Sequence, residues 1–438
     1  MPSEKSIRTT LLKNQYENYY NIGLKMISES PYFSISSDGK SIAEKILKFV
    51  EELESDKCVS IITDNTSSMR SAWNIIKCKF PKIFANGCAA HVINLLIKDI
   101  ISLDYFKETM TYALQIVLFI KRIQLLSYRF NELKKQYRIQ NTLVIPVDTR
   151  WYTHYNSLPK LMNAKFTIEL LIEDHIMSNI KESEKKKSFM KIVSDSEFWK
   201  KVKNLSTILE FPSNIIGKFK SDNYDLANIY NDFKRLLCHF EKHDLESGII
   251  VKLLYERWAF IHTESMGFAF VLSPIYASDD MIGSDKLDTL KQLKKYYTIF
   301  YDSEEEISLA IFELNEYLTQ FVFMSDSTKE EIFKMSNFQY WAIVGKSKFS
   351  NLSKIAIRLF TVPTSSASSE GIWSMYNFIH GKRRNRLLNE NVEKLAFLYI
   401  NSSLLDKEDK QNYLCDESYI KDNDEEEMTL LSSFYDLT

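Results

Sequence analysis

The chain has 438 residues, enough for two or three domains and a large buried core. Apolar residues make up 45% and charged residues 26% of it, a balance that excludes a disordered or collagen-like chain. Ten Gly and eight Pro leave few helix breakers, and a formal net charge of -2 excludes the strongly basic composition of a dedicated nucleic-acid-binding domain.

No transmembrane helix and no export signal are expected. The most apolar stretch, Met110–Ile120, is followed by Lys121 and Arg122, so it is shorter than the roughly 18 residues of a membrane-spanning segment. Residues 1–8 lack the apolar stretch of a signal peptide. Five scattered cysteines, an odd number, agree with reducing surroundings, and these features together predict an intracellular protein.

The first hundred residues predict an α/β unit. Two runs of aromatic and β-branched residues, Tyr19–Ile27 and Tyr32–Ile35, predict a β-hairpin. Apolar residues at helical spacing follow, and Cys58–Ile62 is then expected to form a short buried strand. Further helices are predicted over 66–79 and 90–101, and this alternation of strands and helices is typical of an α/β fold.

The rest of the chain is expected to be helical. The apolar pattern from Leu158 to Lys334 is almost wholly helical, and Thr364 and Ser365 can cap a helix after Pro363. The last predicted helix begins near Asn389, and its apolar stripe consists of Val392, Leu395, Ala396 and Tyr399. Residues 406–438 contain 11 Asp or Glu and three Lys or Arg, which predicts an acidic, flexible tail.

Asp64 is the first candidate for chemistry. It directly follows the predicted buried strand and precedes a helix, and functional sites in open α/β sheets gather at such strand ends. The alternative is an Asp that caps the next helix.

A zinc site is not expected. Cys88 and His91 would supply half of one, but no second pair of ligands lies at the usual spacing. A buried Cys beside a hydrogen-bonded His is therefore the favoured interpretation.

Two clusters have the composition of a DNA contact. Arg150 and Trp151 offer a cation and an aromatic ring for pairing with phosphate or stacking on a base. Four cations, Lys382, Arg383, Arg384 and Arg386, fall within five positions and could contact several phosphates. Ordinary aromatic packing and a solvated loop are the alternatives.

Five sequence elements, in this order, resemble those of the hAT transposase superfamily. They are Thr63–Met69, Cys88–Leu95, Thr149–Trp151, Pro363–Ser374 and Arg384–Leu387. The resemblance implies an α/β ribonuclease-H-like core that is interrupted by a large all-α insertion, in a chain that is helix-rich overall.

The resemblance also implies a division of the chain. Residues 1–155 would form the N-terminal part of the core, with its first strand missing or degenerate, and residues 156–334 the helical insertion. Residues 335–405 would complete the core and include the family's dimerisation region. Residues 406–438 would be the acidic tail.

Transposases of this family cut DNA with two divalent metal ions, which two Asp and one Glu hold. By resemblance, Asp64 matches the second Asp and Glu370 the Glu, and Mg²⁺ suits such oxygen ligands. Trp151 matches a Trp that stacks on an extruded base in the family.

The first Asp of the family's triad has no clear match. The predicted hairpin would place the first core strand within residues 1–15, which contain no Asp. Asp38 is the other candidate, but only one helix and one strand separate it from Asp64. Loss of one ligand should remove most metal binding and nearly all strand transfer.

The leading hypothesis is a truncated or domesticated transposase-derived protein, intracellular and nuclear, that has lost catalysis, needs no cofactor and acts as a homodimer. Its dimer contacts are expected at Trp373, Tyr376, Val392, Leu395 and Tyr399. The alternative is an active, Mg²⁺-dependent DNA transposase. Non-specific binding to DNA is compatible with both, and no membrane partner is expected.

Overall fold

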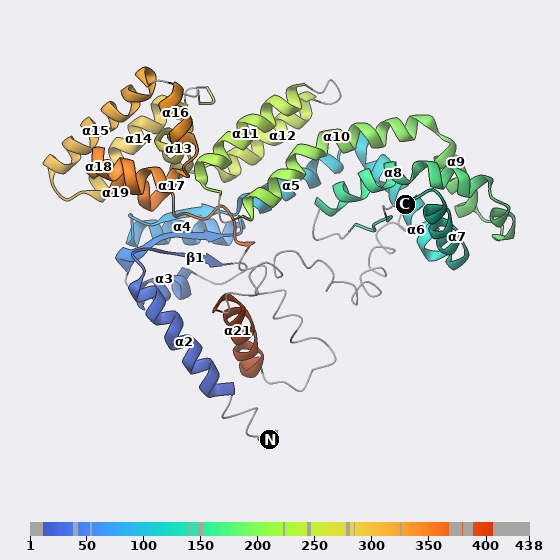
Figure 1. Ribbon diagram of the computed structural model, residues 1–438, viewed down its shortest axis with the longest axis horizontal. Helices are drawn as coiled ribbons and strands as arrows, with labels where there is room; N and C mark the ends of the chain where they lie inside the picture. Colours follow the sequence, from blue (N-terminus) through green and yellow to red (C-terminus); the bar gives the residue numbers. More distant parts are fainter. Residues whose placement is uncertain are drawn as a thin grey trace.

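The computed structural model describes residues 12–37, 43–52, 55–139, 142–146, 152–221, 224–242, 247–276, 281–283, 285–324, 326–367, 379 and 389–405. Within these ranges the protein is rich in helix and contains one small sheet (Figure 1). The strands are β1 (Phe33–Ser37), β2 (Cys58–Thr63) and β3 (Phe84–Gly87). The helices are α2 (Leu12–Glu29), α3 (Ala43–Glu52), η2 (Ser55–Lys57), α4 (Ser67–Lys79), α5 (Ala89–Ile101), α6 (Asp104–Arg122), α7 (Gln124–Gln136), α8 (Tyr152–Glu173), η3 (His175–Asn179), α9 (Glu184–Ser194), α10 (Ser196–Phe219), α11 (Leu226–Glu241), α12 (Ser247–Ile261), α13 (Glu264–Leu272), α14 (Asp285–Phe300), α15 (Glu304–Phe323), α16 (Asp326–Phe333), α17 (Asn337–Tyr340), η4 (Trp341–Gly345), α18 (Lys346–Lys348), α19 (Ser350–Leu359) and α21 (Asn389–Leu405).

The three strands are parallel and lie in the order β1-β2-β3. Every residue of β2 is buried, as expected for the central strand of a parallel sheet that is covered on both faces. The pairing places Ser37 beside Thr63 and Thr63 beside Gly87, so all three strands end at one edge of the sheet. Helices α3 and α4 supply the crossovers that parallel strands require.

The predicted hairpin over residues 19–35 is wrong. Residues 12–29 form the helix α2, and β1 pairs in parallel with β2 instead of with the segment before it. Partly buried residues recur in α2 at positions 12, 16, 19, 23 and 27, the three- and four-residue spacing of a helix. This periodicity outweighs the strand propensity of the Tyr and Ile residues, which depends strongly on context.

The other predicted elements of the α/β unit are confirmed to within one residue. The strand expected over 58–62 is β2, and the helices expected over 66–79 and 90–101 are α4 and α5. The helical pattern from 158 to 334 is also confirmed in the described residues, which contain α8 to α16. Across those same ranges, no helix combines the length and apolar character that a membrane crossing requires.

One continuous apolar core joins the sheet to the helices. It extends from Val59 in β2 through α5, α8 and α10 to Val362. Helix α10 packs against α5 and α8, α12 packs against α5, and α11 packs against α13 (Figure 1). Helix α5 follows β3 directly, and its buried side chains join the apolar core at the sheet to that of α10 and α12.

The C-terminal part of the chain returns to the N-terminal sheet. Arg358 in α19 donates to the carbonyl oxygens of Asp56 and Cys58, at 2.9 and 3.2 Å, where β2 begins. Further along, α21 packs against α2, and the two helices lie side by side below the sheet in Figure 1. Both ends of the described chain therefore meet on the same side of the sheet.

Candidate functional site

Asp64 lies at the edge where the parallel strands end. It follows β2 directly, and its Oδ1 accepts hydrogen bonds from the backbone N–H and the hydroxyl of Thr66, at 3.3 and 2.9 Å. The position predicted for Asp64, after a buried strand and before a helix, is thus confirmed. Its two bonds hold the turn into α4, because Thr66 is the last residue before that helix.

The turn around Asp64 is fixed from both sides. The Thr63 hydroxyl donates to the Asp64 carbonyl at 2.8 Å and accepts from the Trp73 indole N–H at 3.1 Å. The Asn65 amide donates to the Cys88 carbonyl at 3.2 Å. A Cβ on Gly87 would lie only 1.6 Å from Asn65 Oδ1, so glycine is required where β3 passes this turn. Asp64 therefore stands on a turn that is tied to the neighbouring strand.

The segment that leads toward Glu370 reaches the same edge of the sheet. The Thr364 carbonyl accepts from the Ala89 N–H at 3.0 Å, and the Thr364 hydroxyl donates to the Phe219 carbonyl at 2.7 Å. The Ser366 N–H donates to Cys88 Sγ at 3.4 Å. The first residues of the Pro363–Ser374 element thus lie at the start of α5, next to the ends of β2 and β3. Sequence reasoning missed this contact, since no local pattern relates residue 89 to residue 364.

Most of the other predicted site residues lie outside the described residues. They are Asp38, Arg150, Trp151, Glu370, Trp373, Tyr376, Lys382, Arg383, Arg384 and Arg386. Within the part of the chain that the structure describes, no three His, Cys, Asp or Glu side chains group closely enough to hold a metal ion. The roles assigned to these residues, and to Asp64, stay predictions.

Two cysteines at the sheet, Cys58 and Cys88, are buried. Cys88 is fully buried, and its thiol accepts the Ser366 N–H, while His91 is half-buried in the first turn of α5. Burial raises the pKa of the Cys58 thiol to about 12, and the nearby Arg358 only partly opposes this. Cys58 therefore stays protonated at neutral pH, where a protonated thiol is a poor nucleophile.

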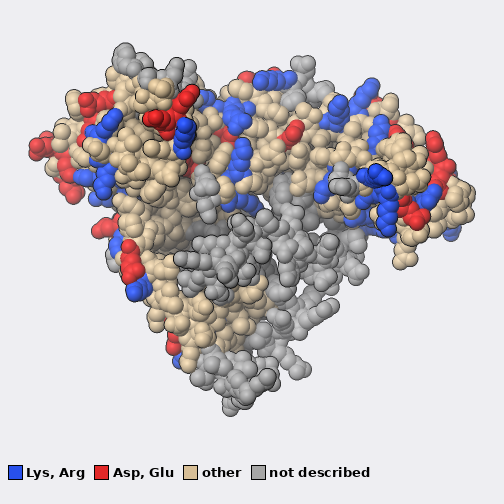
Figure 2. Space-filling view, viewed as in Figure 1, with Lys and Arg blue, Asp and Glu red and all other residues tan. Residues whose placement is uncertain are grey.

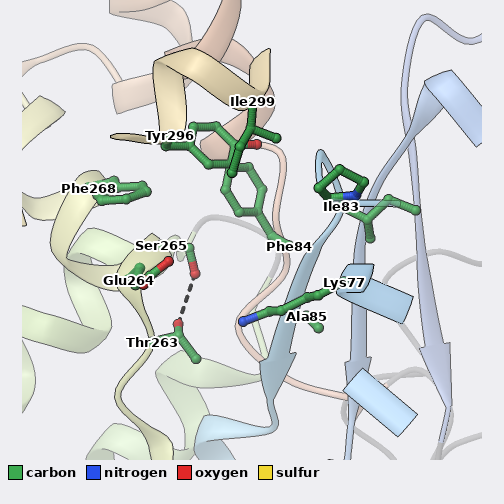
Figure 3. A pocket seen from close by; sticks show the side chains of 11 residues that line it. Lys77, Ile83, Phe84, Ala85, Thr263, Glu264, Ser265, Phe268, Tyr296 and Ile299 are labelled. Carbon is green, nitrogen blue, oxygen red and sulfur yellow. Dashed lines mark hydrogen bonds between the residues drawn. The ribbon is translucent and has the colours of Figure 1, made fainter. Parts of the chain in front are cut away.

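A cavity of about 150 Å³ lies at the other end of β3 (Figure 3). Phe84 and Ala85 line it, together with Lys77 from α4 and Tyr296 from α14. Burial raises the pKa of the Tyr296 phenol, which therefore stays neutral. The hydroxyls of Thr263 and Ser265, which also line the cavity, both donate to Asn86. The cavity opens beside the first two residues of β3, whereas Asp64 lies beyond the last residue of β2, so the cavity is separate from the Asp64 edge.

Helix α21 contains three of the predicted dimer contacts. Val392 is buried in a small cluster with Ile379 and Ala396, and Leu395 packs against it. Tyr399 is 42% exposed. The first two residues thus stabilise the protomer, whereas Tyr399 presents an aromatic ring at the surface.

Charges of both signs are spread over the described surface. Lys and Arg side chains lie over α10 to α12 in the middle of the view, and Asp and Glu side chains lie mainly toward its two ends (Figure 2). Several surface charges pair within one helix, as Lys165 does with Glu169 and Lys200 with Glu197. The described residues on this face form no uniformly positive surface of the kind that tracks a DNA backbone (Figure 2).

Three family models match the chain. Residues 20–116 match a domain of unknown function, DUF659, and residues 87–205 match the ZBED1 RNase-like helical domain. Residues 313–402 match the hAT family C-terminal dimerisation region. The chain is an hAT-family transposase-like protein. No curated protein matches it closely enough to count as a relative.

The matched regions of this hAT-family protein coincide with its structural parts. The first match covers the sheet, and the second begins at the end of β3 and runs through α5 into α10. The dimerisation region includes α19 and most of α21. Arg358 therefore connects the dimerisation region to the start of β2.

The bonding of Asp64 leads to a first prediction. Replacing Asp64 with Ala should lower the free energy of unfolding by about 1 kcal/mol, because two hydrogen bonds to Thr66 are lost. Asp64→Asn should lower the free energy of unfolding by clearly less, since the amide oxygen of Asn can still accept the hydrogen bonds from Thr66. Urea unfolding of both variants measures the difference. An equal loss in the two variants would contradict this account, because it would show that the charge stabilises the turn.

Proposed function

We propose that this hAT-family protein acts as a homodimer held together through its C-terminal region. The observation that carries the proposal is the match of residues 313–402 to a dimerisation region. Apolar side chains at the surface of that region support it, since Ile343 is 64% exposed and Tyr399 is 42% exposed. Burial of exposed Tyr and Ile side chains against a partner is favourable, because it removes apolar surface from water.

We also propose that the sheet is part of a ribonuclease-H-like core, with the helices of residues 156–334 inserted into it. Two features support this assignment. The three strands are parallel and follow one another in the sheet, and Asp64 follows the central one. The Pro363–Ala367 segment reaches the same edge from the far end of the chain.

Loss of DNA cutting belongs to the proposal. A two-metal site needs three carboxylates that converge, and the resemblance expects the first of them on the first core strand. β1 contains no carboxylate. In addition, one oxygen of Asp64 accepts two hydrogen bonds from Thr66. Dimerisation requires neither a carboxylate on β1 nor metal binding by Asp64.

Metal-dependent DNA cutting is the second candidate function, and the register of the sheet favours it. Ser37 pairs with Thr63, and in the sequence Asp38 follows Ser37 just as Asp64 follows Thr63. In this case Asp38, Asp64 and Glu370 would hold Mg²⁺, whose chemistry is to activate water and stabilise the leaving oxygen. The basic residues Lys382, Arg383, Arg384 and Arg386, with Arg150 and Trp151, would hold the DNA.

Two measurements on the full chain separate these functions. Sedimentation velocity over a micromolar concentration series should show a dimer, and a monomer throughout would overturn the main proposal. Nicking of supercoiled DNA is then assayed with Mg²⁺ or Mn²⁺, and no nicking is expected. Nicking that is lost in Asp64→Asn and in Glu370→Gln, but kept in the exposed-surface control Asp288→Asn, would establish the second candidate instead.

A further inference from the structure

Helix α2 has an apolar face that is wider than the protein covers. At about 100° per residue, the partly buried positions 12, 16, 19, 23 and 27 form a central stripe along the helix. Apolar residues continue on both sides of this stripe and are exposed: Tyr20 (42%) and Leu24 (37%) on one side, and Ile22 (37%) and Met26 (57%) on the other. No residue of α2 is buried.

Helix α21 covers only part of this apolar face. Phe397 packs against Tyr16, with ring centroids 4.9 Å apart, and against Tyr20 at 6.2 Å. The buried residues of α21, Val392 and Ala396, instead pack with Ile379. The contact between α2 and α21 is therefore aromatic and local, and it leaves Ile22, Leu24 and Met26 of the flanks partly exposed.

The remaining side of α2 is polar and belongs in water. Lys25 lies on this side and pairs with Glu29 at 3.7 Å, whereas the pair Lys13–Glu17, also at 3.7 Å, lies near the start of the helix on the flank of Tyr20 and Leu24. An isolated helix of this length is only marginally stable, so most of its stability must come from packing of its apolar face. Helix α2 has a broad apolar face and no buried residue, so within the described part of the protomer α21 covers only part of that face.

We propose that the apolar face of α2, together with the adjacent face of α21, binds the same pair of helices in a second copy of the chain. This inference rests on the proposed homodimer and extends it, because α2 lies outside the matched dimerisation region. The surface is continuous with that region, since α2 packs on α21, most of which lies within residues 313–402. A two-fold axis beside the helices would set Tyr20, Leu24, Ile22 and Met26 of one copy against the same face of the other, as a closed dimer interface requires.

The residue types fit such an interface. Tyr and Met are enriched in the buried centres of protein interfaces, and charged residues are depleted there. The four exposed apolar residues of α2 are Tyr, Ile, Leu and Met, and Lys25 lies on the opposite side of the helix, while Lys13, Glu17 and Glu29 border the two flanks. A pairing of two α2–α21 units gives the geometry of a four-helix bundle, in which apolar stripes face inward.

The test uses the full chain and sedimentation velocity over a concentration series. Leu24→Glu combined with Met26→Glu should weaken dimerisation by about tenfold or more, because charged groups would replace apolar contacts. Asn21→Glu, at an exposed position on the polar side of the same helix, is the matched control and should leave the dimer unchanged. Circular dichroism and urea unfolding of each variant report whether the protomer stays folded.

The outcomes separate this inference from the proposed function. A dimeric wild-type chain whose affinity is unchanged in the Leu24→Glu, Met26→Glu variant would overturn the role of α2 and leave the homodimer standing. A wild-type monomer would overturn both. If the double variant loses helix content, Ile22→Gln, a milder change on the same flank as Met26, replaces it, and unchanged affinity in that folded variant would also overturn the inference.

Discussion

Replacing Trp341 with alanine should lower the free energy of unfolding by about 3–5 kcal/mol, the range for a fully buried Trp. Trp341 is fully buried, and its ring lies 4.9 Å from that of Tyr317. Its indole N–H donates to the Leu272 carbonyl at 2.7 Å, so the substitution removes both a large apolar volume and a buried hydrogen bond. Gly345 makes room for the ring, since a Cβ there would lie 2.3 Å from it.

Trp341→Phe is the control for the packing part of this effect. It keeps most of the aromatic contact and loses the hydrogen bond, so we expect the free energy of unfolding to fall by about 1–2 kcal/mol. The Tyr317 hydroxyl also donates to the Leu272 carbonyl, at 2.8 Å, so that oxygen keeps one donor. Urea unfolding of the wild type and the two variants at a single protein concentration gives the three free energies of unfolding, because the proposed dimer would make stability depend on concentration. A loss below about 1 kcal/mol for Trp341→Ala would contradict the packing around η4.

Arg358→Ala should lower the free energy of unfolding by about 3 kcal/mol, because it removes two hydrogen bonds that a buried charged group donates. Arg358 is only 7% exposed, and it donates to the carbonyls of Asp56 and Cys58. Its guanidinium also lies 5.5 Å from the centre of the Tyr32 ring. Those carbonyls belong to the segment that leads into β2, so the loss should weaken the attachment of α19 to the sheet.

Lys354→Ala, on the same helix, is the matched control. Lys354 pairs with Glu306 at 3.3 Å, but both side chains are about half exposed, so water screens the pair. We expect less than about 1 kcal/mol for this substitution. Hydrogen exchange of the β2 amides should accelerate in Arg358→Ala and stay unchanged in Lys354→Ala. Equal exchange in both variants would show that Arg358 does not hold α19 to the sheet.

Local patterns in the sequence predicted much of the fold. β2, α4 and α5 follow from a short apolar run and from apolar residues at helical spacing, and these signals depend only on near neighbours. The segment at 19–27 was predicted wrongly, because its Tyr and Ile residues favour strands while its partly buried positions have helical spacing. The aromatic contact with Phe397, almost 400 residues away, has no local signal.

The candidate site was predictable only in part. The position of Asp64 at a strand end follows from the strand and helix that flank it, and this placement is confirmed. The parallel pairing of β1 with β2, which sets Ser37 beside Thr63, could not be read from the sequence because pairing direction depends on the path of the chain. The contact of Thr364 with Ala89 is likewise a property of the tertiary fold, as is that of Arg358 with Asp56.

The contact between Arg358 and Asp56 also constrains how the protein is made. These residues are 302 positions apart, so the start of β2 leaves the ribosome long before its partner in α19 exists. At ordinary rates of translation this interval lasts roughly 15 to 60 s. During that time the carbonyls of Asp56 and Cys58 lack their Arg358 donor, so the N-terminal unit cannot reach its final stability until α19 has been made.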